Sequence, residues 1–134
     1  MKTQNAILTD IYKIIKASPI NDLGGGVYKK TRPTASILED CVISLISGAR
    51  AKFLQDAALY VKIFYNDIKS NNTYSENELS GQAKEQLLIN LSETLLSTSG
   101  YSFEIESRET YTEKVLDDDI NQHFAILKIN FLLT

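Results

Sequence analysis

The chain has 134 residues, a formal net charge of −3 at pH 7, 43% hydrophobic residues and 23% charged residues. A chain of this length buries roughly two-thirds of its unfolded surface, so we expect a single domain, residues 1–134, with a core of its own. The net negative charge argues against a general polyanion-binding protein, and the single cysteine excludes an intramolecular disulfide.

The first predicted element is an amphipathic helix that ends at Ser18-Pro19, because the residue before a proline is pushed out of the helical region. Lys13 and Lys16 interrupt the segment, so we expect neither a signal peptide nor a membrane span, and a protein that folds in a cytoplasm. The apolar stripe of this helix consists of Ile7, Leu8, Ile11, Ile14 and Ile15.

Three strands are predicted next, over residues 27–30, 41–47 and 57–66. Residues 24–26, three glycines, are interpreted as a flexible loop, because a phosphate-binding loop would follow a strand and open a helix. Residues 47–52 are interpreted as the loop that joins the second and third strands. The third strand alternates most clearly, with one face formed by Ala57, Leu59, Val61, Ile63 and Tyr65.

A polar stretch and then a longer second helix follow. Ser75 and Glu78 have the spacing of a capping box, and Gly100 is placed to end this helix. The predicted apolar stripe is Leu79, Ala83, Leu87, Leu88, Leu91 and Leu95. The last two strands are predicted at residues 101–106, with a continuation through Tyr111, and at residues 125–133.

The order of these elements, α-β-β-β-α-β-β, predicts an α+β fold in which two helices pack on one face of a mostly antiparallel sheet of four to five strands. Short connections within each group of strands favour antiparallel pairing. In the last strand, Ala125, Leu127, Ile129, Phe131 and Leu133 form one apolar set, which we expect to lie in the core under the helices.

Three further features are candidate chemical sites. His123 is either a general base for a Ser or Cys nucleophile or a structural residue at the start of a strand, and the missing nucleophile motif favours the structural role. Asp117-Asp118-Asp119 lacks the alternating ligands and the turn glycine of a calcium loop, which favours a solvated hairpin tip. Cys41 follows two acidic residues and is interpreted as a small buried hydrophobic residue. The sequence therefore predicts no catalytic, cofactor or metal site.

The second face of the strands is unusually apolar for a surface in free solvent. We expect a partner subunit or a helix to cover it, and we expect Ile126 and Leu132 to be substantially exposed in an isolated monomer. The candidate oligomer or partner surface is Arg50, Lys52, Tyr60, Lys62, Phe64, Ile126, Lys128 and Leu132. A complementary patch is expected in the loops at residues 47–55 or 115–120.

The pattern resembles the small tail-terminator (tail-completion) proteins of long-tailed bacteriophages, in a variant from phages or prophages of gut anaerobes. The resemblance covers nearly the whole chain in element order and length. The stretches that carry it are Gly26-Val27-Tyr28-Lys29, Arg32-Pro33, Glu39-Asp40-Cys41-Val42-Ile43, Tyr60-Val61-Lys62-Ile63-Phe64 and His123-Phe124-Ala125-Ile126-Leu127-Lys128-Ile129-Asn130-Phe131.

The resemblance implies a structural virion assembly protein that joins head to tail. Such proteins form rings, often hexameric, at the head-proximal end of the tail and contact tail-tube and connector proteins. It also implies no enzyme activity, no cofactor, no sequence-specific nucleic acid or membrane partner, and a location in the host cytoplasm and then in the virion. Two alternatives stay open: a small protein-binding module of a mobile element, and a small enzyme that uses His123 and a carboxylate.

Overall fold

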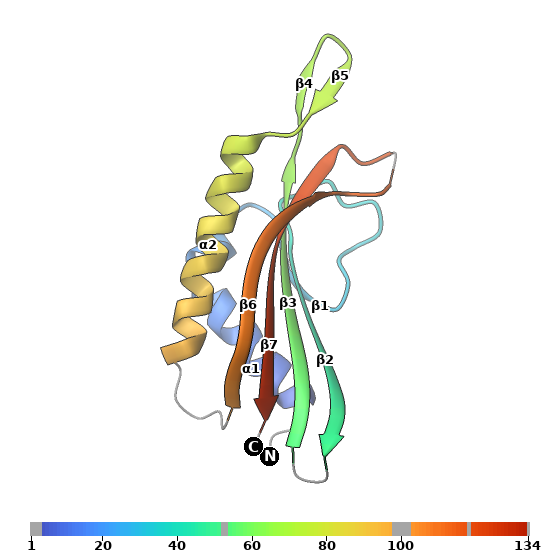
Figure 1. Ribbon diagram of the computed structural model, residues 1–134. Coiled ribbons are helices and arrows are strands. Elements are labelled where there is room, and N and C mark those ends of the chain that lie inside the picture. Colours follow the sequence, from blue (N-terminus) through green and yellow to red (C-terminus); the bar gives the residue numbers. More distant parts are fainter. Residues whose placement is uncertain (1–3, 52–53, 98–102, 118, 134) are drawn as a thin grey trace.

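The computed structural model describes residues 4–51, 54–97, 103–117 and 119–133 (Figure 1). The elements in chain order are α1 (Gln4–Lys16), η1 (Pro19–Asp22), β1 (Val27–Lys29), β2 (Cys41–Ala51), β3 (Leu54–Asn66), β4 (Ile68–Ser70), β5 (Thr73–Ser75), α2 (Glu78–Ser97), β6 (Phe103–Lys114) and β7 (Gln122–Leu133).

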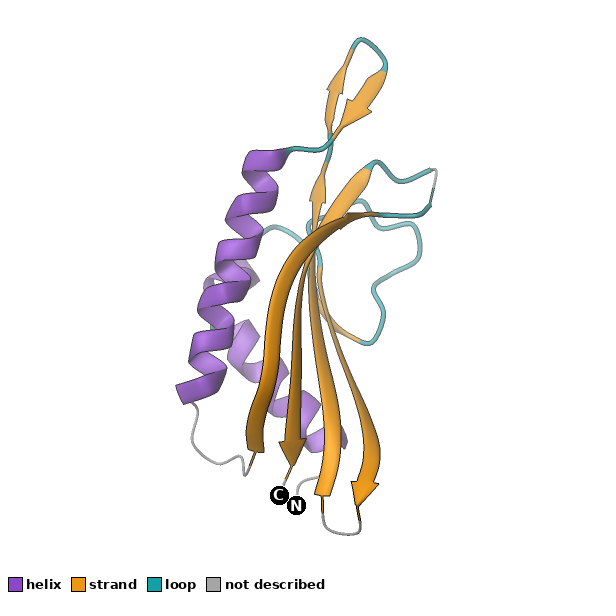
Figure 2. Ribbon diagram, in the orientation of Figure 1, coloured by secondary structure: helices purple, strands orange, loops and turns teal. Residues whose placement is uncertain are grey.

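Five strands form one sheet in the order β1-β2-β3-β7-β6, and both helices lie on one face of it (Figure 2). This confirms the predicted α+β class. The sheet is mixed rather than purely antiparallel, since β1 runs parallel to β2 while the other neighbours are antiparallel. The second sheet, a hairpin of β4 and β5, was not predicted.

The core lies between the helices and the sheet, where the stripe of α1 and alternate residues of the three central strands meet. Ala125, Leu127 and Ile129 of β7 are buried there, as expected, whereas the side chains of Phe131 and Leu133 lie outside the described set. Period-2 alternation therefore predicted the covered face of the sheet correctly. The buried cluster consists of Ile7, Leu8, Ile11, Ile15, Ile20, Val27, Cys41, Ile43, Leu45, Ala57, Leu59, Val61, Ile63, Tyr65, Leu88, Leu91, Leu95, Ala125, Leu127 and Ile129.

Residues 47–51 are part of β2, so the predicted loop at this place is wrong. Ser47 pairs with Ala57 and Ala49 with Gln55, and the register shifts between Ala49 and Ala51. The residues are small and have low strand propensity, but pairing along the edge of β3 outweighs that weak local preference. Arg50 consequently lies in a strand instead of a loop, and Lys52 lies outside the described residues.

The second helix begins two residues later than a Ser75 cap would require. Asn77 caps it, since the Ser80 N–H donates to Asn77 Oδ1 at 3.1 Å, while Ser75 belongs to β5. Leu79 is 79% exposed instead of buried, because at 3.6 residues per turn it lies about 180° from Leu88 on the helix. Ala83 is exposed as well, whereas Gly81 and Lys84 are buried, so the first turns bury a different face from the one predicted. Gly100 lies outside the described residues.

The polar stretch after β3 folds into the β4–β5 hairpin. Asn71 and Asn72 have φ values of 51° and 66°, which is the left-handed pair that a two-residue type I′ turn requires. The hairpin projects beyond the end of the five-stranded sheet and beyond α2 (Figure 1).

The glycine run before β1 has a definite packing role, which corrects its interpretation as a flexible loop. Only Gly24 has a positive φ, of 90°. A Cβ on Gly25 would overlap the backbone of Glu39 and Asp40, so this position needs glycine for close approach of two chain segments. The Gly26 N–H donates to Asp40 Oδ1 at 3.0 Å.

Candidate interaction surface

Pairing of β3 with β7 brings together five of the eight residues of the predicted surface. Lys62 lies opposite Ile126 and Tyr60 opposite Lys128, and Phe64 is one pair further along the same face. This face is the one that the helices leave uncovered. For Leu132 and Arg50 the structure describes the backbone within β7 and β2 but not the side chains.

Cationic side chains lie over the aromatic rings of this open face. Lys62 Nζ lies 4.8 Å from the centroid of the Phe124 ring, and Lys128 Nζ lies 5.7 Å from that of Tyr60. Arg32 Cζ lies 3.5 Å from the Phe64 centroid. Long side chains cover apolar surface with their methylene groups while the charge stays near water, so much of this face is covered by its own residues.

Ile126 is only 4% exposed in the single chain, so the expectation that it would be substantially exposed in a monomer is wrong. Its cross-strand neighbours are Lys62 on β3 and Tyr111 on β6, two long side chains on the same face. Apolar content on a sheet face therefore does not by itself indicate a missing partner here.

The exposed apolar side chains gather elsewhere, at the end of the sheet where β2 begins, β3 ends and β7 begins. We call this the apical end. Of the eight large hydrophobic residues that are exposed among the described side chains, six belong to segments at this end. They form the apical hydrophobic set: Ile37, Leu38, Ile68, Tyr74, Leu79 and Leu116.

Sequence reasoning missed this set. Leu79 was assigned to the buried stripe, and Leu116, which is 97% exposed, stood unnoticed beside an acidic run. One usable signal was present: Asn71-Asn72 between two short alternating segments is a hairpin signature, and it would have placed Ile68 and Tyr74 on a two-stranded unit.

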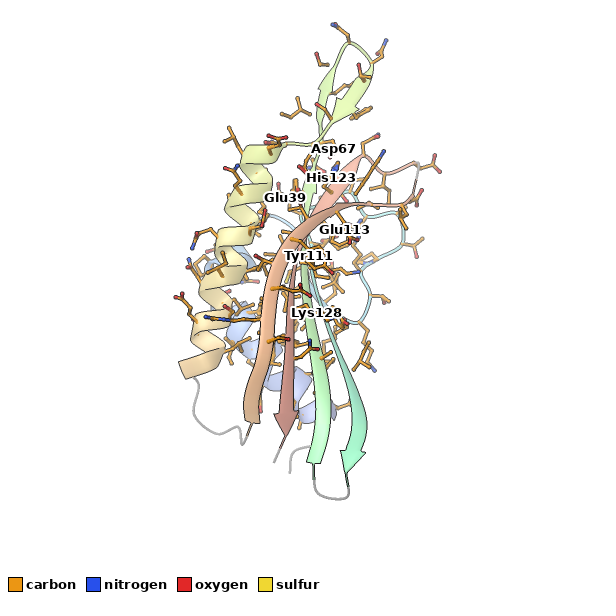
Figure 3. All side chains as sticks on the ribbon, in the orientation of Figure 1. Glu39, Asp67, Tyr111, Glu113, His123 and Lys128 are labelled. Carbon is orange, nitrogen blue, oxygen red and sulfur yellow. The ribbon has the colours of Figure 1, made fainter. Side chains whose placement is uncertain are left out.

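The root of the hairpin is held by a polar cluster. Asp67 precedes β4 and its Oδ1 lies 2.6 Å from His123 Nδ1. Glu76 follows β5, and its Oε1 accepts a hydrogen bond of 3.2 Å from the Tyr65 hydroxyl and lies 3.7 Å from His123 Nε2. Burial, together with the Glu76 carboxylate, raises the pKa of Tyr65, which keeps this hydroxyl a donor. Figure 3 shows Asp67 and His123 together where β7 begins.

This cluster bears on the enzymatic alternative. His123 is oriented by two carboxylates, but no serine or cysteine hydrogen-bonds to it among the described residues. Cys41, the only cysteine, is fully buried in the core as predicted, and burial raises the pKa of its thiol to about 12. The observed contacts of His123 join the hairpin root to the sheet.

The loop at residues 30–40 is fixed by a second buried carboxylate. Asp40 is fully buried and accepts hydrogen bonds from Gly26 N–H and from Ser36 Oγ at 2.5 Å, and it pairs with Arg32 at 3.4 Å. Arg32 also donates to Gln122 Oε1 at 3.0 Å, which connects the loop to the first residue of β7. Charge-assisted hydrogen bonds thus hold the loop that carries Ile37 and Leu38 at two places. One is Gly26, just before β1, and the other is Gln122 at the start of β7.

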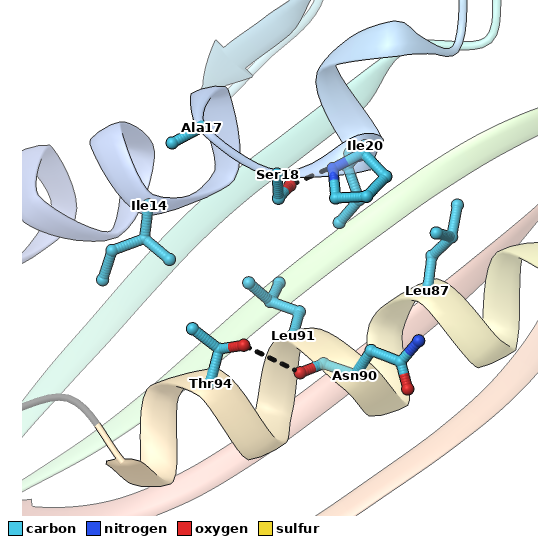
Figure 4. Close-up of a pocket in the computed structure, with 9 residues that line it drawn as sticks. Ile14, Ala17, Ser18, Ile20, Leu87, Asn90, Leu91 and Thr94 are labelled. Carbon is cyan, nitrogen blue, oxygen red and sulfur yellow. Dashed lines mark hydrogen bonds between the residues drawn. The ribbon is translucent and has the colours of Figure 1, made fainter.

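A groove of about 420 Å³ runs between the end of α1 and α2 (Figure 4). Ile14 and Ile20 line one side and Leu87 and Leu91 the other, while Asn90 and Thr94 supply polar groups on α2. It lies on the helix layer, away from the open face of the sheet.

Within the part of the chain that the structure describes, no group of three or more His, Cys, Asp or Glu side chains could hold a metal ion. No described helix combines the length and apolarity that crossing a bilayer requires. The sequence matches no protein-family model, and a comparison with curated proteins finds no significant relative.

Proposed function

We propose that this chain is a structural virion assembly protein, a tail terminator or neck component that forms an oligomeric ring at the head-proximal end of a phage tail. The observation that carries the proposal is the apical hydrophobic set on a small domain with a projecting hairpin. Exposed apolar groups gathered at one end of a domain are typical of a protein that acts through contacts with other proteins.

A closed ring needs a head-to-tail contact between two unlike surfaces of the same chain. The domain offers such surfaces, since the projecting hairpin differs from the open sheet face with its Lys62 and Lys128 side chains. The resemblance to tail terminators rests on the element order, to which the structure adds the β4–β5 hairpin between β3 and α2. The two helices complete the core on one face of the sheet, so the open face and the apical end remain available for contacts with other copies.

Oligomer size tests the proposal directly. Light scattering after size exclusion, with negative-stain microscopy, is expected to show rings at high protein concentration or on purified tail tubes of the same phage. Lys62→Glu is expected to reduce ring formation without unfolding the domain, and the matched change Lys16→Glu, on the exposed side of α1, is expected to leave it unchanged. A chain that stays monomeric at every concentration and ignores tail tubes would contradict the proposal.

The groove between α1 and α2 favours a second candidate, a small protein-binding module of a mobile element. Its volume of about 420 Å³ and its apolar walls suit an apolar peptide segment. Under this alternative the protein is a monomer or dimer, and changes at Leu87 abolish partner binding while changes in the hairpin do not.

A further inference from the structure

We propose that the β4–β5 hairpin of one copy docks on the outer edge of β6 in the next copy, as an added strand. This inference rests on the proposed ring and names the strand contact within its interface, next to the open face of the sheet: the arm, residues 68–75, docks on the edge, the outward side of β6. The occupant of the edge is therefore a second copy of this chain.

Beyond its root, the arm has little contact with the described part of the chain. Its six strand residues are all exposed, and among the described strands β4 and β5 pair only with each other. Ile68 and Tyr74 are each about half exposed, at 49% and 46%. A two-stranded hairpin is at best marginally stable alone in water, so docking on a third strand would stabilise it.

The edge offers unpaired backbone groups. The Val115 N–H donates to the Gln122 carbonyl at 3.0 Å just beyond β6. In an antiparallel pair, residues that bond to the neighbouring strand alternate with residues that do not, so this bond shows which residues of β6 face β7. Every second residue from there, including Tyr111, bonds to β7, so the intervening residues direct their N–H and C=O groups outward. These outward residues are Arg108, Thr110, Thr112 and Lys114, and no described strand lies beyond them.

The side chains of the arm match the two sides of the edge. Ile68 lies on the opposite face of the hairpin from Lys69, because adjacent strand residues alternate. Between α2 and β6 there is a cleft of about 210 Å³, lined in part by Ile89 and Thr110, and Ile89 is 38% exposed. The cleft has room for one large aliphatic side chain, which is the role we assign to Ile68.

On its other side, β6 carries two carboxylates, and Lys128 of β7 is the cross-strand neighbour of one of them, Glu109. Glu109 and Glu113 lie on the open face of β6, are exposed and form no ion pair with another described residue. Lys69 is the only charged residue of the arm, and it shares a face with Tyr74. Placing Ile68 in the cleft brings Lys69 to the side of these carboxylates, so charge and shape select the same orientation.

The pairing joins two copies and not two parts of one. In a single chain the arm points away from the sheet beyond α2 (Figure 1), and its root is fixed by the contacts of Asp67 and Glu76 with His123 and Tyr65. Arm and edge are unlike surfaces, so the contact is head-to-tail and can close into a ring.

Disulfide trapping tests the inference. Cys41 is buried, so a chain with Lys69→Cys and a chain with Glu109→Cys each present one reactive thiol. Mixing the two is expected to give a disulfide-linked pair of twice 15.0 kDa at least tenfold faster than either chain alone. The matched control mixes Glu109→Cys with Lys16→Cys, which is exposed on α1, and should react at the slow rate.

A charge-reversal pair supplies the second readout. Lys69→Glu is expected to weaken self-association about tenfold, and mixing it with Glu109→Lys should restore it. Trapping at the control rate while the wild-type chain still forms rings would overturn this inference and leave the proposed ring intact. Self-linking of Lys69→Cys alone at the fast rate would also overturn it, since that result indicates a symmetric contact between arms. Absence of any ring or tail-tube binding would instead count against the proposed function.

Discussion

The large apolar residues of this chain occupy two regions with opposite roles. Those between the helices and the sheet, such as Leu88 and Leu127, are buried almost completely and hold the fold together. Those at the apical end, such as Leu79 and Leu116, are mostly in solvent. The difference shows that hydrophobic residues in one sequence, even in one helix, divide into a set that folds the domain and a set that is free for contacts.

The two segments that carry much of the apical set differ in the same way. The loop at residues 30–40 is tied to the sheet by the buried Asp40 and by Arg32. The hairpin at residues 68–75 is held only at its root, by His123 and Tyr65. The loop is therefore part of the folded domain, while the hairpin is an appendage whose loss leaves the core contacts in place.

Removing the buried carboxylate of the loop should have the largest effect. Asp40→Ala leaves the Arg32 guanidinium, which is 11% exposed, without its carboxylate partner and the Gly26 N–H without the Asp40 acceptor. Breaking a buried pair from one side costs about 3–5 kcal/mol of unfolding free energy, so we expect a loss of about 4 kcal/mol in urea titration. The control is Asp119→Ala in the exposed loop before β7, which should change stability by less than about 0.5 kcal/mol.

The two ends of α2 give the next contrast. Leu88→Ala empties a fully buried site and should lower the unfolding free energy by about 3 kcal/mol. Leu79→Ala makes the same chemical change at a side chain that is 79% exposed and should cost less than about 0.5 kcal/mol. Equal losses in a thermal or urea titration would mean that Leu79 packs in the core, as the sequence pattern suggested.

These positions also show how far the sequence could lead. Alternation in β3 and β7 predicted the covered face correctly, because one buried face imposes a strict period of two. The leucines of α2 misled, since its six leucines are spread around the helix and a stripe can be drawn from Leu79 as well as from Leu88. Packing of α2 against the sheet decides which leucines are buried, and the spacing of the leucines within the helix does not reveal it.

The candidate surface was harder to predict than the fold. Register placed Lys62 and Ile126 together as expected, but whether Ile126 is covered depends on the side-chain conformations of Lys62 and Tyr111 across three strands. The role of residues 25–26 was also hidden, because it depends on a close approach to Glu39 and Asp40 that no local pattern encodes.

Alkaline pH should separate the buried region from the apical one. Burial, together with the Asp40 carboxylate, raises the pKa of Cys41 to about 12, whereas an unfolded chain has a cysteine pKa of about 8.5. Above pH 8.5 the unfolded state therefore loses a proton that the folded state keeps. Stability is unaffected below pH 8.5 and falls between there and pH 12 by about 1.4 kcal/mol per pH unit from this group.

Urea titrations from pH 8 to pH 10.5, compared with those of Cys41→Ala, test this dependence. Tyr65, whose pKa is also raised, adds to the loss only at higher pH, so the variant should show a flatter profile over the lower part of the range. Parallel profiles of the two proteins would mean that the thiol is not desolvated in the folded state.

The smallest effect concerns the turn of the arm. Asn71 and Asn72 both adopt left-handed backbone conformations, which glycine accepts more readily at the second position of a type I′ turn. Asn72→Gly should stabilise the hairpin by a few tenths of a kcal/mol, and Asn72→Val should disorder it, because a β-branched residue is strained there. Since β4 and β5 pair only with each other among the described strands, the urea midpoint of either variant should match that of the wild type. Amide exchange in β4 and β5 should nevertheless slow with glycine and accelerate with valine. A shift of the global midpoint by Asn72→Val would show that the arm contributes to folding, and the division between folding and contact residues would then have to be redrawn at the hairpin.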